Sequence, residues 1–159
     1  MSLSSLYATL RSYESSASWW RTSASQYQEQ MNDTNTALDG KRKQLKLAQA
    51  TKAQVDLLPA SNQTVSDNLT VLGSTLNGAI AEPTAQQRCS DVNKDNADII
   101  TRAQTACTTL INNLTTEIGG LEADLDRQTE GYNYSNGRAA TYDSYASSMR
   151  TRIANYDGD

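Results

Sequence analysis

Apolar residues in the first third of the chain recur at alternating steps of three and four residues. The series comprises Leu3, Leu6, Leu10, Tyr13, Ala17, Trp20, Ala24, Tyr27, Met31, Leu38, Leu45 and Ala48, with Thr34 and Lys41 as its only interruptions. A mean spacing of about 3.5 residues keeps one row of side chains on the helix face that meets a partner helix. The pattern predicts a long helix over residues 3–58, ended by Pro59 because proline cannot continue a helix.

The same spacing predicts two further helices. Val65, Leu69, Leu72, Leu76 and Ile80 indicate a short helix over 64–80, after a polar break at 59–62 and before a turn near Pro83. A long helix is predicted over 84–156 from Ala97, Ile100, Cys107, Ile111, Leu114, Ile118, Leu121, Leu125, Ala139, Tyr142, Ala146, Met149, Ile153 and Tyr156. The glycine-containing stretch at 131–138 should break or loosen it.

Two apolar rows of similar length on either side of one turn favour an antiparallel arrangement of the long helices. We therefore expect an all-α fold, an elongated, coiled-coil-like helical hairpin, with the short helix near the mid-chain turn. It should form a single helical domain over residues 1–159. In this arrangement Leu6, Leu10 and Tyr13 would lie beside Tyr142, Met149 and Ile153.

Composition narrows the functional classes. Hydrophobic residues make up 37% of the chain, phenylalanine is absent, and the formal charge is −4. This balance provides no basic surface for nucleic acid, and the longest apolar stretches are too short for a transmembrane segment. The N-terminus has no basic segment followed by an apolar core. We expect synthesis in the cytoplasm and, if the protein is exported, export without a cleaved signal peptide.

Residues that carry chemistry are scarce. The chain has no histidine and only two cysteines, so common general bases and zinc sites are not expected. Cys89 and Cys107 lie eighteen residues apart in one predicted helix, roughly 27 Å, whereas a disulfide needs about 6 Å. Glu117, Glu122, Asp124 and Asp126 are typical of a solvated helix face. We predict no enzymatic activity, no cofactor and no metal.

Tyrosine and tryptophan provide every aromatic ring, and these rings concentrate near the two ends of the chain. The hairpin would bring the ends together, so the rings either fill its core or contact a further helix. Trp19 and Trp20 are adjacent and point about 100° apart on a helix, so both cannot face one seam. The predicted partner interface is Tyr7, Tyr13, Trp19, Trp20, Tyr27, Tyr142, Tyr145 and Met149.

The helix lengths, the mid-chain turn and the acidic, Ser/Thr/Asn-rich composition resemble the LXG-toxin-associated α-helical proteins of bacterial type VII secretion, which are enlarged WXG-like hairpins. In the turn motif, Leu76 stands where that family has tryptophan, and Gly78 matches its glycine. The family's export signal is Tyr-x-x-x-Asp/Glu, and Tyr132, Tyr134, Tyr142 and Tyr145 do not match it, since the residues four positions later are Asn136, Arg138, Ala146 and Met149. The resemblance implies a partner or targeting subunit that binds the helical N-terminal domain of an LXG toxin.

A different interpretation fits the heptad spacing equally well. The chain could be a self-assembling structural coiled coil, such as a homodimeric rod or spacer, with the adjacent tryptophans at the interface between copies. Docking on a lipid surface is a weaker interpretation, because the polar faces carry few lysines and arginines.

Overall fold

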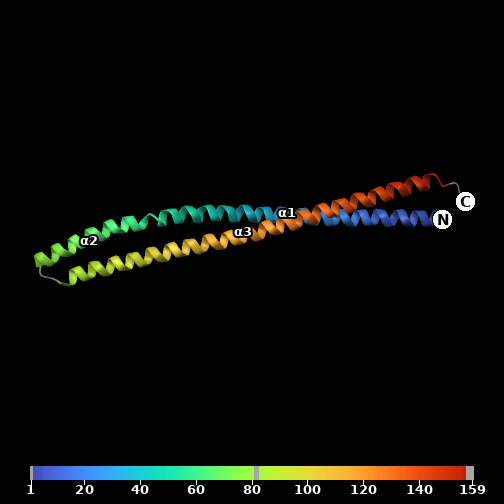
Figure 1. Cartoon of the computed structure of the whole chain (residues 1–159). Helices are drawn as coiled ribbons and strands as arrows, with labels where there is room; N and C mark the ends of the chain where they lie inside the picture. The colour runs from blue at the N-terminus through green and yellow to red at the C-terminus, as the bar shows by residue number, and fades with distance from the viewer. Residues whose placement is uncertain (1, 81–82, 157–159) are drawn as a thin grey trace. The chain divides into compact units, whose positions relative to one another are not determined.

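The computed structural model describes residues 2–80 and 83–156, and the side chains of these residues except 73, 76–80 and 83–86. Three helices account for nearly all of this part of the chain: α1 (Leu3–Val55), α2 (Leu58–Ile80) and α3 (Pro83–Ala154) (Figure 1). No strand occurs among the described residues. The predicted all-α fold is therefore confirmed.

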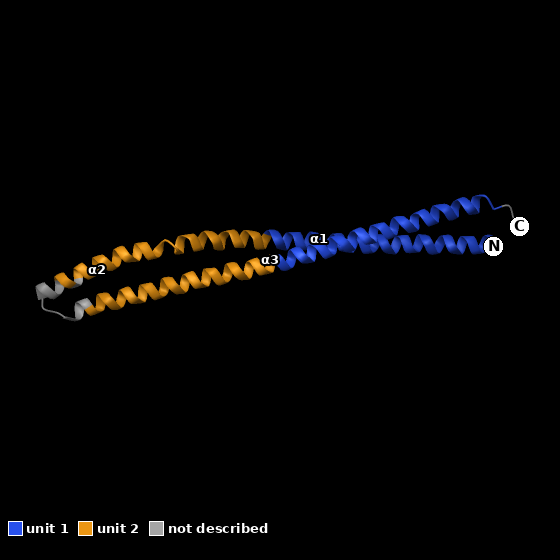
Figure 2. Ribbon diagram, in the orientation of Figure 1, with its two compact units in different colours: residues 1–39, 119–159 blue, residues 40–118 orange. Residues whose placement is uncertain are grey.

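The chain divides into two compact units, Met1–Asp39 with Gly119–Asp159 (unit 1) and Gly40–Ile118 (unit 2) (Figure 2). In unit 1, α1 and α3 run antiparallel. Glu14 pairs with Arg150 at 2.6 Å, Arg21 pairs with Asp143 at 2.5 Å, and Tyr27 lies against Gly131. As the residue number rises on one helix, it falls on the other, which is the predicted hairpin pairing.

The core of unit 1 is the predicted seam. Its buried residues are Leu6, Ala17, Ala24, Thr34 and Leu38 from α1, and Ser135, Ala139, Ala146 and Met149 from α3. Four of these residues are alanines, whose small side chains let two helices approach closely. A core this narrow covers the large rings of the seam only in part, and Tyr13, Trp20 and Tyr142 are half-buried.

Unit 2 is also an antiparallel arrangement, with α1 and α2 on one side and α3 on the other. Its buried apolar residues are Ala48, Leu114 and Ile118. Lys41 pairs with Glu117 at 2.5 Å, and Gln104 donates a hydrogen bond to Asp56 at 3.3 Å. The two residues that interrupt the apolar row of α1 thus belong to the seam, because Thr34 is buried and Lys41 is half-buried and ion-paired.

The break after α1 comes earlier than predicted. The helix ends at Val55, residues 56 and 57 form a turn, and residues 59–62, predicted as a polar break, are helical. Pro59 has no N–H to donate to the Val55 carbonyl, and its ring would clash with that carbonyl in a continuous helix, which accounts for the end of α1 at Val55. Pro59 itself occupies the first turn of α2, where a missing N–H costs nothing.

The predicted break at 131–138 is wrong, because α3 is continuous there. Tyr27 explains Gly131: a Cβ atom at Gly131 would lie 2.5 Å from the Tyr27 ring. Because Gly131 has no side chain, the Tyr27 ring can pack directly against the backbone of α3 at this position. Ser135 is buried and its hydroxyl lies 3.2 Å from that of Ser23, so a hydrogen bond satisfies both. The seam therefore continues through this stretch, with Tyr132 half-buried and Ser135 buried. The side chain of Leu76 and the environment of Gly78 lie outside the described residues.

Candidate partner-binding site

A group of aromatic rings with one arginine lies along unit 1. Trp19 and Trp20 contact each other edge to face, with ring centroids 4.5 Å apart, and Trp20 meets Tyr134 in the same geometry at 5.4 Å. Edge-to-face contacts are favourable because the positive ring edge meets the negative ring face. The contact between α1 and α3 at this level is thus made by rings.

A second ring group lies further towards the chain ends. Tyr13 on α1 is 6.2 Å from Tyr142 and 5.4 Å from Tyr145, and these two tyrosines of α3 are 6.0 Å apart. The predicted meeting of Tyr13 with Tyr142 is confirmed. The aromatic residues from the two ends of the chain do come together.

Arg138 joins the two ring groups. Its guanidinium carbon lies 5.7 Å from the Trp20 ring centroid and 5.3 Å from that of Tyr142, and Nη2 donates a hydrogen bond to the Tyr142 hydroxyl at 3.2 Å. Both distances are within the range of a cation–π interaction. Nε of Arg138 is buried without a hydrogen-bond partner. The arginine therefore lies between the two ring groups and contacts a ring of each.

Counted with Ala17 of α1 and Ala139 of α3 at heptad position a, Tyr13, Trp20 and Tyr142 fall at position d between the helices, and the other four residues of these groups fall on one side of the helix pair. Buried residues occupy positions a and d, while e and g flank them on opposite sides, and in an antiparallel pair the two g rows share a side. Arg138 and Tyr145 fall at g, and Trp19 and Tyr134 fall at the neighbouring position c. We call Trp19, Trp20, Tyr134, Arg138, Tyr142 and Tyr145 the aromatic side of unit 1.

The opposite side of unit 1 is polar. Glu14, Arg21, Asp143 and Arg150 all fall at position e, and they form the two inter-helical ion pairs described above. These side chains are about half exposed, so each pair contributes little to stability. Their position confirms the heptad assignment, because e faces e in an antiparallel pair. Unit 1 therefore has one charged side and one aromatic side.

The predicted interface residues separate into four environments. Trp19 and Tyr145 are exposed on the aromatic side, at 62% and 49%, whereas Trp20 and Tyr142 are half-buried in it, and Tyr13 is half-buried against Tyr142 and Tyr145. Tyr27 is half-buried against Gly131, and Met149 is buried in the core. Tyr7 is exposed but falls at position e, on the polar side. Met149 is therefore inaccessible to a partner while unit 1 is folded.

Two residues of the aromatic side are missing from the predicted set. Tyr134 is 61% exposed and contacts Trp20, and Arg138 bridges the ring groups. Their heptad positions are the sequence signal that could have identified both residues, since positions c and g of α3 lie on the same side as positions c and g of α1. That signal requires the helix to be continuous through 131–138, which the glycines obscured.

Other kinds of site have little support in the described part of the chain. Cys89 and Cys107 are free thiols, both half-buried. No group of three potential metal-ligating residues occurs among the described positions, and none of the described helices combines the length and apolarity that crossing a bilayer requires. No protein-family model, curated protein or solved structure matches the chain.

Proposed function

We propose that this chain is a non-enzymatic helical subunit that binds a helical segment of another protein along the aromatic side of unit 1. The partner we propose is the helical N-terminal domain of an LXG-type toxin, bound for type VII secretion, as the sequence resemblance implies. The chain would supply two helices of a joint helical assembly, and the toxin would supply the others.

The observation that supports binding is the exposure of Trp19, Tyr134 and Tyr145 in one connected group of rings. Large aromatic residues and arginine are the residue types that dominate binding energy at protein interfaces. Here they border half-buried rings and Arg138, so a partner would meet a surface that is already held in place. Exposed aromatic rings that contact one another are expected of a binding site rather than of a solvated helix face.

The exposed area gives the scale of the effect. At 62% exposure, Trp19 leaves about 150 Å² in water, and burying this area is worth about 4 kcal/mol at roughly 25 cal/mol per Å². Part of that gain is lost in ordering the interface. We therefore expect Trp19→Ala to weaken binding by roughly 10- to 100-fold, a loss of about 1.4–2.7 kcal/mol.

Calorimetric titration of the full chain with the N-terminal helical domain of an LXG toxin from the same genome tests the proposal. The variants are Trp19→Ala and Tyr145→Ala, each at an exposed position of the aromatic side. Tyr7→Ala is the matched control, because Tyr7 is similarly exposed but lies on the polar side. Circular dichroism on each variant verifies that helicity is unchanged.

We expect both aromatic-side variants to lose affinity and Tyr7→Ala to bind like the wild type. Equal losses at all three positions would refute the aromatic side as the binding surface. A wild-type chain that binds no LXG domain would refute the identity proposed for the partner.

A further inference from the structure

Unit 2 carries a second row of residues at heptad spacing beside its buried seam on α3. The row advances in alternating steps of three and four residues, and its members are Cys89, Val92, Asn96, Ile99, Ala103, Ala106, Leu110 and Asn113. This spacing is the one that meets another helix. None of the eight residues is charged. The charged residues of this stretch, from Arg88 to Arg102, occupy the other solvent-facing positions.

A matching row runs along α1 and continues into α2 without a change of register. Its steps also alternate between three and four residues, over Gln44, Leu47, Thr51, Gln54, Leu58, Ser61, Val65, Asn68, Leu72 and Thr75. It too contains no charged residue. By contrast, Arg42, Lys43, Lys46 and Asp67 lie at neighbouring positions outside the row. One row on each arm of the helical hairpin therefore contains no charged residue.

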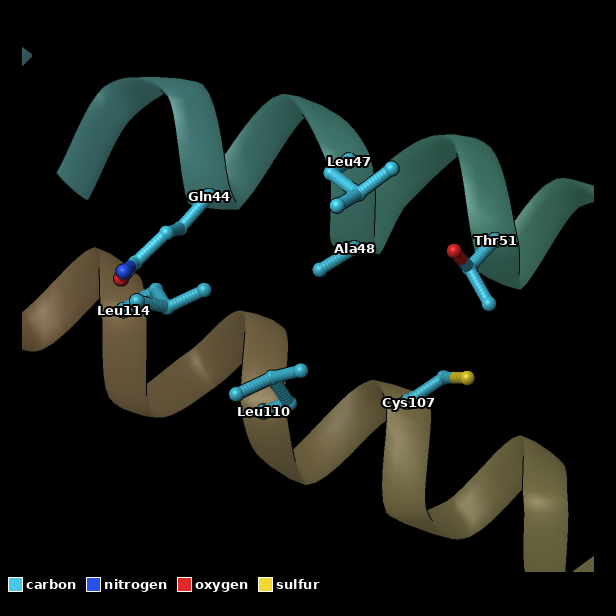
Figure 3. A pocket seen from close by; sticks show the side chains of 7 residues that line it. All are labelled: Gln44, Leu47, Ala48, Thr51, Cys107, Leu110 and Leu114. Carbon is cyan, nitrogen blue, oxygen red and sulfur yellow. The ribbon is translucent and has the colours of Figure 1, made fainter. Parts of the chain in front are cut away.

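The two rows lie on the same side of unit 2. An open pocket of about 270 Å³ is lined by Gln44, Leu47 and Thr51 from α1 and by Cys107, Leu110 and Leu114 from α3. Figure 3 shows side chains of the two helices extending towards each other across it. Members of both rows meet in one pocket, as the shared side of the g positions in an antiparallel pair requires. We call the two rows together the uncharged side of unit 2.

The uncharged side exposes enough apolar surface for an interface. Its large apolar residues are between 43% and 69% exposed, and they are Leu47, Leu58, Val65, Leu72, Val92, Ile99 and Leu110. With roughly 150–180 Å² for each whole residue, they leave roughly 600 Å² of surface in water, against about 800 Å² per partner in a stable complex. The small residues between them, such as Ala103 and Ala106, would supply much of the remainder.

We propose that the occupant of the uncharged side is a second copy of this chain, packed through the same side. A two-fold interface brings each surface against its own duplicate, so a charge near the axis meets a charge of the same sign. A side without charge avoids that repulsion. The exposed apolar area is close to the area that a stable dimer buries on each partner. The heptad spacing of the two rows fits packing against the helices of the second copy. This dimer does not involve the aromatic side of unit 1 and does not rest on the function proposed for it.

Sedimentation equilibrium of the full chain over a range of concentrations tests the proposal. Ile99→Glu places a charge at the uncharged side, at a position 61% exposed. Val71→Glu is the matched control: Val71 is also β-branched, is 66% exposed in the same unit, and lies outside both rows. An equimolar mixture of Ile99→Glu and Ile99→Lys restores attraction between the two copies. Circular dichroism verifies that each variant is as helical as the wild type.

We expect a wild-type dimer with a dissociation constant in the micromolar range, because the apolar area is at the lower end for stable complexes. Ile99→Glu should raise the dissociation constant at least tenfold, Val71→Glu should leave it unchanged, and the mixture should recover most of the affinity. A wild-type chain that stays monomeric over the whole concentration range would overturn the proposal. This result would also be found if a helix of another protein, and not a second copy, occupied the uncharged side. An equal increase of the dissociation constant in Ile99→Glu and Val71→Glu would overturn the proposal as well.

Discussion

Replacing Gly131 by alanine should destabilise the protein, although alanine is the stronger helix former of the two residues. In the structure a Cβ atom at Gly131 would lie 2.5 Å from Cζ of Tyr27, 2.6 Å from Cε1 and 2.9 Å from Cε2. Gly137 lies in the same helix, and a Cβ atom there would meet nothing within 4 Å. Gly137→Ala is therefore a control with the same chemical change and no steric cost.

The magnitude follows from two opposed effects. Alanine in a helix interior gains up to about 1 kcal/mol over glycine, and this gain applies at both positions. Non-bonded carbon atoms prefer separations of about 3.5–4.0 Å, so Gly131→Ala also forces the half-buried Tyr27 ring to move by about 1 Å. Overpacking of this kind costs about 1–3 kcal/mol. We expect Gly137→Ala to stabilise by about 0.5–1 kcal/mol and Gly131→Ala to be destabilising by up to about 2 kcal/mol.

Urea unfolding followed by circular dichroism measures both free energies of unfolding. A Tyr27→Ala background completes the experiment, because removing the ring should make the two glycine substitutions equivalent. If Gly131→Ala stabilised the wild-type chain as much as Gly137→Ala does, the packing of Tyr27 into the Gly131 position would be refuted.

Three further substitutions test the fold and the aromatic side. Leu38→Ala should cost about 2–4 kcal/mol of unfolding free energy because Leu38 is 2% exposed. Leu57→Ala should cost less than about 0.5 kcal/mol, because Leu57 is 62% exposed and lies outside the uncharged side. Pro59→Ala restores an N–H that can reach the Val55 carbonyl, so backbone chemical shifts should turn helical at residues 56–57. Arg138→Leu should lower the free energy of unfolding in urea by about 1–2 kcal/mol, because two cation–π contacts are lost. An unchanged free energy would show that Arg138 does not stabilise the aromatic side.

The first helix was predictable because its seam repeats without a gap. The predicted row from Leu6 to Ala48 is buried or half-buried throughout. Thr34 and Lys41 looked like interruptions but keep the period: Thr34 is small enough to be buried, and Lys41 reaches Glu117 from a half-buried position. Position in the heptad determined burial here, and side-chain polarity did not override it.

The errors at 59–62 and 131–138 have a common origin. Proline and glycine were interpreted as local stop signals, although each is favourable in a particular helical context. Pro59 is compatible with the first turn of α2, and Gly131 is required by a tyrosine on another helix. The second requirement depends on a pairing between residues 104 positions apart, which local sequence patterns do not contain.

The aromatic side was predicted in part. Helical geometry predicted that the adjacent tryptophans cannot both face the seam, and Trp19 is exposed whereas Trp20 is half-buried. Antiparallel pairing predicted that Tyr13 lies beside Tyr142, and the two rings are 6.2 Å apart. Arg138 was missed because its role depends on two rings brought together from different helices. Met149 was assigned to the interface although it also belongs to the predicted apolar row of the third helix, and it is buried in the core.

The most direct test of partner binding uses the fluorescence of Trp19. The chain has two tryptophans, so a Trp20→Phe variant leaves Trp19 as its only tryptophan, on the exposed aromatic side. The measurement is the emission spectrum and acrylamide quenching of this variant with and without a tryptophan-free LXG-toxin N-terminal domain, with complex formation verified by light scattering. We predict a blue shift and reduced quenching in the complex. A complex that forms while Trp19 stays as accessible as in the free chain would contradict the account.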